Sequence, residues 1–590
     1  MLSFGLLAGW VTARLWLHPA QGLRANPTDQ ALFEWMLAHG ARVLTAGADP
    51  LFSTRMNVPD GVNLMANTSV LTAALPLTPV TLLLGPHLSF AAFLTGALAG
   101  TATAWYVLLR RMVVRTRSAA WLGAVFAGFA PAMVSHANGH PNIVCQFLVP
   151  VLVWRTVRLR QPRRWARNGA LLALVVVAQA FLNPELLLFT AVGLGILTAV
   201  VGALRPEVRR DARPFLAGLG TATLLSALLL AYPFAVATSG PGSYRGLPPS
   251  VAGYAADLLS FGWYSRESLG GHLLATRRLA QNASEENAFL GWPLLLALPV
   301  LVWWLRRSAL ALAAGVTVLV FAVLSVGPRL RVAGRTTGVP GPWAVLDRLP
   351  VLDAVLPTRW ALAAVPAVAV LVALAWDRAA ASGPALSAPA SGPAWPAPAS
   401  GPAWPAPAPA ARPARSVRLL MAAAVVVLLL PLAPTPLPAA PLAPIPEFVT
   451  TGAWREYTAG DRTVVPLPLP DAHYADPLRW SAATGLALRL PRGYFLGPDG
   501  QPDRRARFSP PPRSTSNVFS RIRDTGTAPP IDARRRAAAV ADLRFWRAGV
   551  VVLPPGPYAA TMRTAMTDLI GIAPVWRGGA WIWDVRPLTT

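Results

Sequence analysis

The segment 215–236, FLAGLGTATLLSALLLAYPFAV, runs for 22 residues without a charged side chain. As an α-helix it is long enough to cross the roughly 30 Å hydrocarbon core of a bilayer. Comparable apolar runs occupy residues 90–109, 119–134, 186–204, 290–305, 309–326, 361–376 and 419–432. The pattern predicts a mainly α protein, built as a polytopic helical bundle in a membrane.

Composition agrees with this class and excludes others. The 590 residues are 54% hydrophobic and 13% charged, which is too apolar for one soluble domain. The net charge of +26 comes from arginine alone, because the chain contains no lysine. No basic module interleaved with aromatic residues accompanies it, so we expect no nucleic-acid partner. The single cysteine, Cys145, excludes an internal disulfide and a multi-cysteine metal site.

Arginine placement predicts the topology. Clusters at 110–117, 155–167, 205–213 and 306–307 each follow an apolar run. Short cytoplasmic loops retain positive charge, so these clusters belong inside. The N-terminus is then cytoplasmic, a first outer loop covers about residues 18–86, and about eleven spans follow. Val70–Leu84 becomes an interfacial helix on the outer surface. We expect a multi-pass protein of a bacterial cell membrane.

The chain divides into four predicted parts. Residues 1–376 form the transmembrane domain with its outer loops, and 377–416 form a cytoplasmic linker rich in Pro and Ala. Residues 417–434 form the last transmembrane helix. Residues 435–590 are more polar and are expected to form a small extracytoplasmic α/β domain. Its expected elements are strands at Thr463–Leu467, Gly485–Leu490 and Gly549–Leu553, a helix at Ala559–Leu569, and a last strand at Gly579–Val585.

In this topology the polar groups able to do chemistry face outward. The first outer loop carries Asn26 and Pro27, a strong helix start, and Gly40 is the expected helix end. Asp29 lies in the first turn of that helix. It is either an acid that stabilises the helix N-terminus or a general base near the membrane surface. Spacing alone leaves both interpretations open.

Further candidates lie in later outer segments. Residues 135–142 read SHANGHPN, and Gly139 and Pro141 predict a turn there rather than a helix. The turn suits binding of sugar hydroxyls or phosphate, or simple helix capping, with a metal less favoured. Its polar members are His136, Asn138, His140 and Asn142. Glu185, at the outer boundary of a span, is either a helix-start acid or a functional carboxylate.

Several basic groups are expected on the outer face despite the bias against them there. Arg245, Arg266 and His272 belong to the long loop at about 238–288. Arginine makes forked contacts to phosphate, so these residues suggest an anionic ligand.

The order of these parts resembles GT-C-type glycosyltransferases, which use polyprenyl-phosphate-linked sugars. It is also similar to large actinobacterial integral membrane proteins described as glycosyltransferases. The matching segments are 29–35, 59–64, 135–142, 325–330 and 493–498. The acid that this family carries early in the chain maps onto Asp29, with Asp49 and Glu185 as candidates for a second acid. His and Asn stand where the family often has another acid, so no metal ligand is assigned and a divalent metal stays an open cofactor.

The resemblance implies an inverting transfer of sugar from a polyprenyl-phosphate donor in the membrane lipid to a glycan, lipid or protein acceptor of the cell envelope. Asp29 would act as general base. His136, Asn138, His140, Asn142, Arg245, Arg266 and His272 would bind the substrates. Two alternatives remain: a non-catalytic envelope assembly factor, and a transporter of a lipid-linked saccharide.

Overall fold

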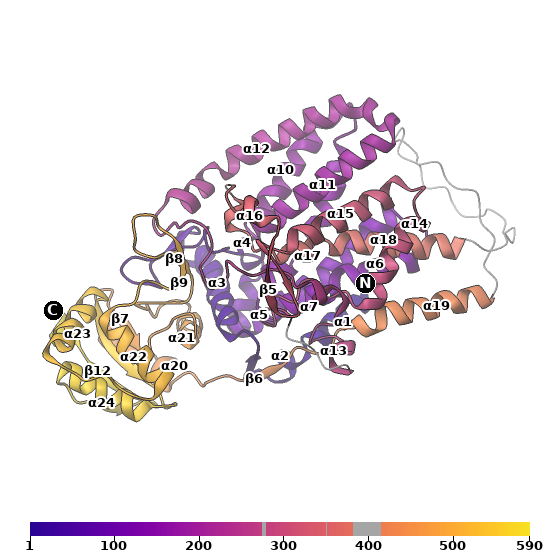
Figure 1. Ribbon diagram of the computed structural model, residues 1–590. Coiled ribbons are helices and arrows are strands. Elements are labelled where there is room, and N and C mark those ends of the chain that lie inside the picture. The colour runs from indigo at the N-terminus through magenta and orange to yellow at the C-terminus, as the bar shows by residue number, and fades with distance from the viewer. Residues whose placement is uncertain (274–278, 350, 382–414) are drawn as a thin grey trace.

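The computed structural model describes residues 1–590 except 274–278, 350 and 382–414, so most of the predicted linker lies outside the described residues. The described chain is mainly helical, with the apolar helices gathered in one bundle and the C-terminal segment beside one end of it (Figure 1). The predicted boundaries between the membrane part, the linker and the C-terminal domain stay predictions.

Within the described residues, five helical stretches are long and apolar enough to cross a membrane. They are α5 (Thr78–Met112), α6 with α7 (Arg117–Phe129 and Pro131–His136), α11 (Pro184–Leu204), η1 with α12 (Pro206–Asp211 and Ala212–Ser239), and α17 with α18 (Arg359–Ala363 and Val365–Ala381). Shorter helices accompany them: α1 (Leu2–Val11), α2 (Ala13–Leu17), α9 (Leu148–Arg158), α10 (Trp165–Ala180), α14 (Trp292–Trp304), α15 (Ala309–Ser325) and α19 (Arg415–Leu429). A polytopic helical bundle is thus observed, while the count of eleven spans stays a prediction.

Residues 18–86, called the first outer loop after their predicted topology, contain the expected helix, but it ends later than predicted. Helix α3 (Pro27–Ala46) runs through Gly40 and ends at Gly47, whose φ of 61° is left-handed. The prediction that the helix ends at Gly40 is wrong, because close packing rather than helix termination explains the glycine at this position. A Cβ at Gly40 would lie 2.5 Å from Cβ of Ala74 in helix α4 (Leu71–Ala74). The glycine lets these helices approach closely.

The C-terminal segment contains a mixed four-stranded sheet in the order β11-β12-β10-β7. Its strands are β7 (Thr463–Pro466), β10 (Ala548–Leu553), β11 (Val575–Arg577) and β12 (Ala580–Asp584). Helices α22 (Ser514–Thr525), α23 (Ala533–Phe545) and α24 (Ala559–Ile570) supply side chains to the hydrophobic core with β7, β10 and β12. The strand predicted at Gly485–Leu490 is absent from this described region, because Gly485 and Leu486 both take positive φ in a turn.

Segments far apart in sequence join the C-terminal part to the first outer loop. Strand β1 (Gln21–Leu23) pairs with β6 (Ala439–Pro441), and α21 (Asp476–Ala483) packs on α3. Asn67 forms two hydrogen bonds with the backbone of Leu496. Its Oδ1 accepts from the N–H of Leu496 at 2.6 Å, and its Nδ2 donates to the carbonyl oxygen of Leu496 at 2.8 Å. That contact fixes strand β8 (Leu496–Pro498), which pairs with β9 (Ala506–Phe508), against the loop.

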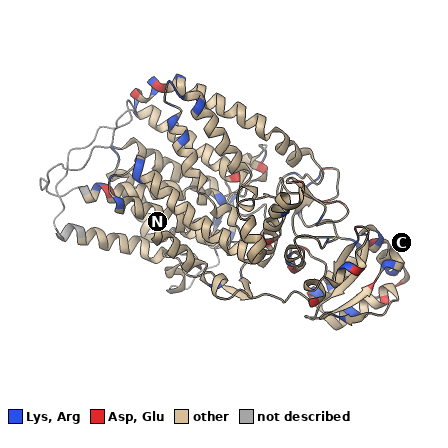
Figure 2. Ribbon diagram, turned by 180° about the vertical axis from the view of Figure 1, so that it is seen from behind, with Lys and Arg blue, Asp and Glu red and all other residues tan. Residues whose placement is uncertain are grey.

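Charge is distributed unevenly over the molecule. Arginine gathers at the end of the bundle away from the C-terminal part, where α9, η1 and the start of α6 lie (Figure 2). Pairs such as Arg160 with Asp211, at 2.6 Å, neutralise only part of it. The clusters that predicted the topology therefore share one end of the fold.

Candidate active site

A polar cavity of about 900 Å³ lies between the first outer loop, the turn after α7, the starts of α11 and α17, and the C-terminal segment. Five charged residues line it: Asp29, Glu185, Glu285, Arg359 and Arg507. Of the residues predicted from sequence, Asp29, His140, Asn142 and Glu185 are in its wall. Convergent charged groups in a large cavity mark the default binding or active site.

Asp29 is turned toward the cavity by its partners. Oδ1 accepts a hydrogen bond from the Tyr494 hydroxyl at 2.8 Å, and Oδ2 lies 3.1 Å from Nε2 of His140. The Asn26 side-chain amide also donates to Oδ2. Side chains, rather than the free N–H groups of α3, thus engage both oxygens. The capping interpretation of Asp29 does not explain these contacts.

Tyr494 reaches Asp29 from the other end of the chain. The two-way contact of Asn67 with Leu496 positions the segment, and the Tyr494 ring stacks on Phe508 with ring centroids 5.8 Å apart. Burial and the neighbouring Asp29 carboxylate raise the pKa of Tyr494 well above its ordinary value. The hydroxyl therefore stays protonated and donates. Residues 493–498 are one of the segments on which the family resemblance rests, but no local pattern indicates this partner.

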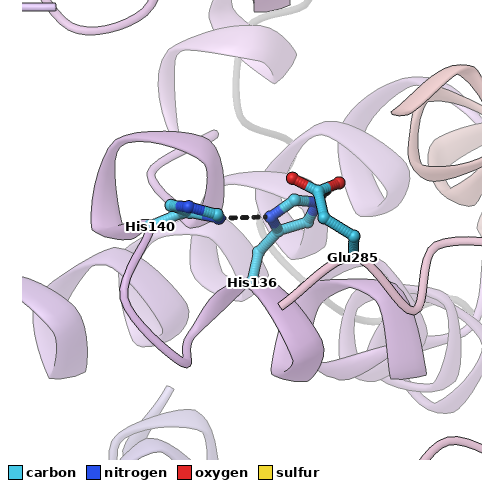
Figure 3. A group of neighbouring side chains, drawn as sticks. All are labelled: His136, His140 and Glu285. Atoms are coloured by element: carbon cyan, nitrogen blue, oxygen red, sulfur yellow. Dashed lines mark hydrogen bonds and ion pairs between the residues drawn. The ribbon is translucent and has the colours of Figure 1, made fainter. Parts of the chain in front are cut away.

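His140 continues the contact network away from Asp29. Its Nδ1 lies 3.0 Å from Nδ1 of His136 (Figure 3). Nε2 of His136 lies 2.7 Å from Oδ1 of Asn287. The Asn287 amide is oriented by its Nδ2, which donates to Glu285 at 2.9 Å. Because Oδ1 of Asn287 only accepts, Nε2 of His136 must carry a hydrogen.

The hydrogen on Nε2 of His136 determines which nitrogen donates in the hydrogen bond between His136 and His140. A neutral His136 with hydrogen on Nε2 can only accept at Nδ1, so Nδ1 of His140 donates. The hydrogen bond between Nε2 of His140 and Oδ2 of Asp29 then holds one proton, which either residue can carry. Asp29 and His140 form an acid–base pair that shares one proton.

Arg359 joins two carboxylates behind this pair. Nη1 contacts Glu185 at 2.8 Å, and Nη2 and Nε contact Glu285 at 2.7 and 3.1 Å. Burial alone would raise the pKa of Glu285, but Arg359 and the two histidines hold it at about 2. Glu185, isolated in the sequence, thus has a partner 174 residues away. Its Oε1 is buried without a hydrogen-bond partner among the described residues.

His136, His140 and Glu285 form the group whose ligand atoms could hold a metal ion, since those atoms lie within 4.8 Å of one another (Figure 3). Their present bonds do not fit a resident ion. Both nitrogens of His136 are hydrogen-bonded, and a guanidinium occupies Glu285. A divalent cation on that carboxylate would face the positive charge of Arg359. The mechanism proposed below therefore uses no metal ion.

Arg507, on β9, is the second cation of the cavity wall. Among the residues that the structure describes, no acidic side chain forms an ion pair with it, and its Nε is buried without a hydrogen-bond partner. Arg359 is committed to two carboxylates, whereas Arg507 keeps donor capacity for an anion. Sequence reasoning missed Arg507 because nothing local separates it from the other arginines of the C-terminal segment.

The remaining predicted site residues lie elsewhere. Asp49 is exposed and accepts from the backbone N–H of Leu51, as a turn residue does. Arg245 is exposed and pairs through its backbone with Arg505. His272 contacts Thr435 at 3.1 Å. Asn138 and Arg266 also lie outside the cavity wall, beside other acids. These residues are not in the cavity wall, and their roles in substrate binding stay predictions.

An apolar cavity lies among the helices of the bundle. It is lined by side chains of α5, α9, α11, α15 and α18, including Leu186 and Phe189. These residues lie within one helical turn of Glu185, which lines the polar cavity. The start of α11 therefore contributes residues to both cavities.

The chain belongs to the family described as domain of unknown function DUF6311, which matches residues 43–389. Comparison with curated proteins gave no match.

Solved structures that resemble the chain include the arabinofuranosyltransferase AftD from Mycobacteria, at 15% identity and TM-score 0.47. The likeness covers 94% of this chain and 34% of AftD, so the chain spans about a third of that protein. Another is the oligosaccharyltransferase AglB from Archaeoglobus fulgidus, in complex with an inhibitory peptide and a dolichol-phosphate. Its identity is 10% and its TM-score 0.46, over 96% of this chain and 70% of AglB. Both are GT-C-type glycosyltransferases, the type that the sequence resembles. At such TM-scores, the activity must be inferred from the site itself.

Proposed function

We propose that the chain is a membrane glycosyltransferase that moves a sugar from a polyprenyl-phosphate donor to a hydroxyl acceptor, with inversion at the anomeric carbon. The observation that carries the proposal is the carboxylate of Asp29, held in a polar cavity by Tyr494 and sharing a proton with His140. This is how a general base must be presented to a substrate hydroxyl.

The reaction follows from the residues in the cavity wall. The acceptor oxygen attacks the anomeric carbon as its proton passes to a carboxylate oxygen of Asp29, while the shared proton stays on Nε2 of His140. The bond between that carbon and the phosphate oxygen breaks, and the leaving polyprenyl phosphate takes the electron pair. Arg507 stabilises the charge that develops there. The base and the cation both belong to one cavity, which is what an in-line displacement needs.

A lipid-linked donor is favoured by the apolar cavity, to which the start of α11 also contributes. Its apolar lining suits a polyprenyl chain, while the phosphate and sugar would lie among polar groups next to Glu185. The arginine cluster at 205–213 follows the C-terminal end of α11, whereas the start of α11 lines this cavity, so the positive-inside rule favours an extracytoplasmic reaction at a bacterial cell membrane. The acceptor is expected to be an envelope glycan, lipid or protein.

The test uses the full chain in nanodiscs. Polyprenyl-phosphate mannose, glucose and arabinofuranose, each with radiolabelled sugar, are incubated separately with an envelope extract as acceptor. We expect label to leave one of these lipids and to appear in the acceptor. Asp29→Asn should lower the rate by about 100-fold or more, the usual contribution of a general base.

Asp49→Asn is the matched control, because Asp49 is exposed, lies in the same loop and lines no part of the cavity. Equal rates in the wild type, Asp29→Asn and Asp49→Asn would remove Asp29 from the mechanism. No transfer from any donor by well-folded protein would favour the alternatives, a non-catalytic envelope assembly factor or a transporter of a lipid-linked saccharide.

A further inference from the structure

A second apolar cavity, of about 320 Å³, lies toward the other end of α11. Side chains of α5, α9, α11 and α15 line it, and η1 and the start of α12 also contribute. It shares side chains with the first apolar cavity, among them Leu194 and Leu197. No described residue lines both it and the polar cavity, so the proposed transfer reaction does not account for it.

The part of α11 that lines this cavity is poorly packed against protein. In α11, all of which the structure describes, only Leu186 and Phe189 are buried, and both lie in its first two turns. The cavity is lined by α11 from Leu194 to Gly202. At 1.5 Å per residue this stretch spans about 12 Å, close to half of the roughly 30 Å hydrocarbon core. The cavity therefore has the depth of one leaflet of a bilayer.

The wall of this cavity carries an unbalanced positive charge. Nη2 and Nε of Arg160 lie 2.6 and 3.0 Å from Oδ2 of Asp211, so these two residues neutralise each other. Nε of Arg209 donates to the carbonyl oxygen of Gly202 at 2.7 Å, which holds its guanidinium at the end of α11. Among the residues that the structure describes, no acidic side chain forms an ion pair with Arg209. The wall therefore keeps one cation without a carboxylate.

The surrounding segments add to this charge. Residues 155–167 and 205–213 together hold ten arginines and two acids, and they lie at the end of the bundle where arginine gathers (Figure 2). A guanidinium binds phosphate oxygens through forked, charge-assisted hydrogen bonds. A zwitterionic headgroup carries its own cation, which this concentration of arginine repels, whereas a headgroup with net negative charge is attracted.

We propose that this cavity binds an anionic phospholipid, with an acyl chain among the apolar side chains and the headgroup phosphate at Arg209. An apolar wall without partner atoms loses dispersion contacts, and a hydrocarbon chain restores them. The lipid fills the space between the second half of α11 and the neighbouring α9 and α12, and so holds the end of α11 in the bundle. The site does not depend on the proposed transfer reaction.

The test measures lipid binding by the full chain purified in detergent. The protein is titrated with phosphatidylglycerol or with phosphatidylcholine of the same acyl chains, and native mass spectrometry counts the bound lipid. We expect one phosphatidylglycerol to bind at concentrations at which phosphatidylcholine does not. Arg209→Gln should weaken that binding about tenfold or more, because it removes a charged hydrogen-bond donor. Arg163→Gln is the matched control, since Arg163 is exposed, belongs to the same arginine-rich end and lines no part of the cavity.

A second variant tests the cavity itself. Val201→Trp adds bulk to the cavity wall without changing its charge, and should also weaken the binding of phosphatidylglycerol. Equal binding of the two lipids by the wild type, or equal binding by Arg209→Gln and Arg163→Gln, would overturn the proposal. Displacement of phosphatidylglycerol by an equal concentration of polyprenyl phosphate would also overturn it, because the cavity would then belong to the donor lipid. The comparison of lipids uses the wild type alone and needs no transfer activity, so the test holds even if a variant folds poorly.

Discussion

Replacing Arg359 by Met removes the cation that holds two carboxylates of the polar cavity. Glu285 is 3% exposed, and Arg359 contacts it through two nitrogens and Glu185 through a third. Removing one partner of a buried ion pair costs about 3–5 kcal/mol, since it leaves an uncompensated charge. We expect Arg359→Met to lower the free energy of unfolding by about that amount at pH 7.

The pKa of Glu285 gives an independent magnitude for the stability that its ion pair with Arg359 contributes. A pKa lowered from 4.5 to about 2 corresponds to about 3 kcal/mol, at 1.36 kcal/mol per unit. This stability is present above the unfolded pKa and is lost as the pH falls through the folded one. The difference between wild type and variant should therefore narrow as the pH falls from about 5 to 2.

The assay is equilibrium unfolding in mixed micelles, followed by tryptophan fluorescence at several pH values. Arg245→Met is the matched control, since Arg245 is exposed, and surface substitutions usually change stability by less than about 0.5 kcal/mol. A loss in Arg359→Met below about 1 kcal/mol, or a difference from wild type that stays constant in acid, would refute the assignment of Arg359 as the charge partner of Glu285.

Other perturbations test separate parts of the site and fold. Tyr494→Phe keeps the stacked ring but removes a hydroxyl bound to a carboxylate, so transfer should fall about 10- to 100-fold while Tm changes little, as rate assays and thermal melts would report. Arg507→Gln should raise the KM for the lipid donor by about 10-fold or more through a lost phosphate contact; an unchanged KM would place the phosphate elsewhere. Gly40→Leu forces a side chain against α4, where a Cβ would already lie 2.5 Å from its neighbour, and should cost about 1–3 kcal/mol. Gly9→Leu, in open space on α1, should cost less in the same unfolding experiment.

The sequence alone determined the class of molecule and identified particular residues as candidates for the site. The 22 uncharged residues at 215–236 dictate a helix in lipid, because the backbone must satisfy its own hydrogen bonds there. Asn26 and Pro27 similarly fix where α3 begins. Both signals are local, since hydropathy and capping depend on neighbours in the chain. They also place Asp29 on the first turn, without deciding its role.

The tertiary structure decided which side chains meet. Asp29 contacts Tyr494 across 465 residues and His140 across 111. Which loop docks where depends on the packing of the whole bundle, so no local pattern could predict these pairs or remove Asp49 from the site. The same reason applies to Gly40. A local rule predicts a helix end there, whereas the contact with α4 shows that the glycine permits close packing. The fold decides which side chains lie close enough to react, whereas the apolar composition of the helices decides that the chain resides in a membrane.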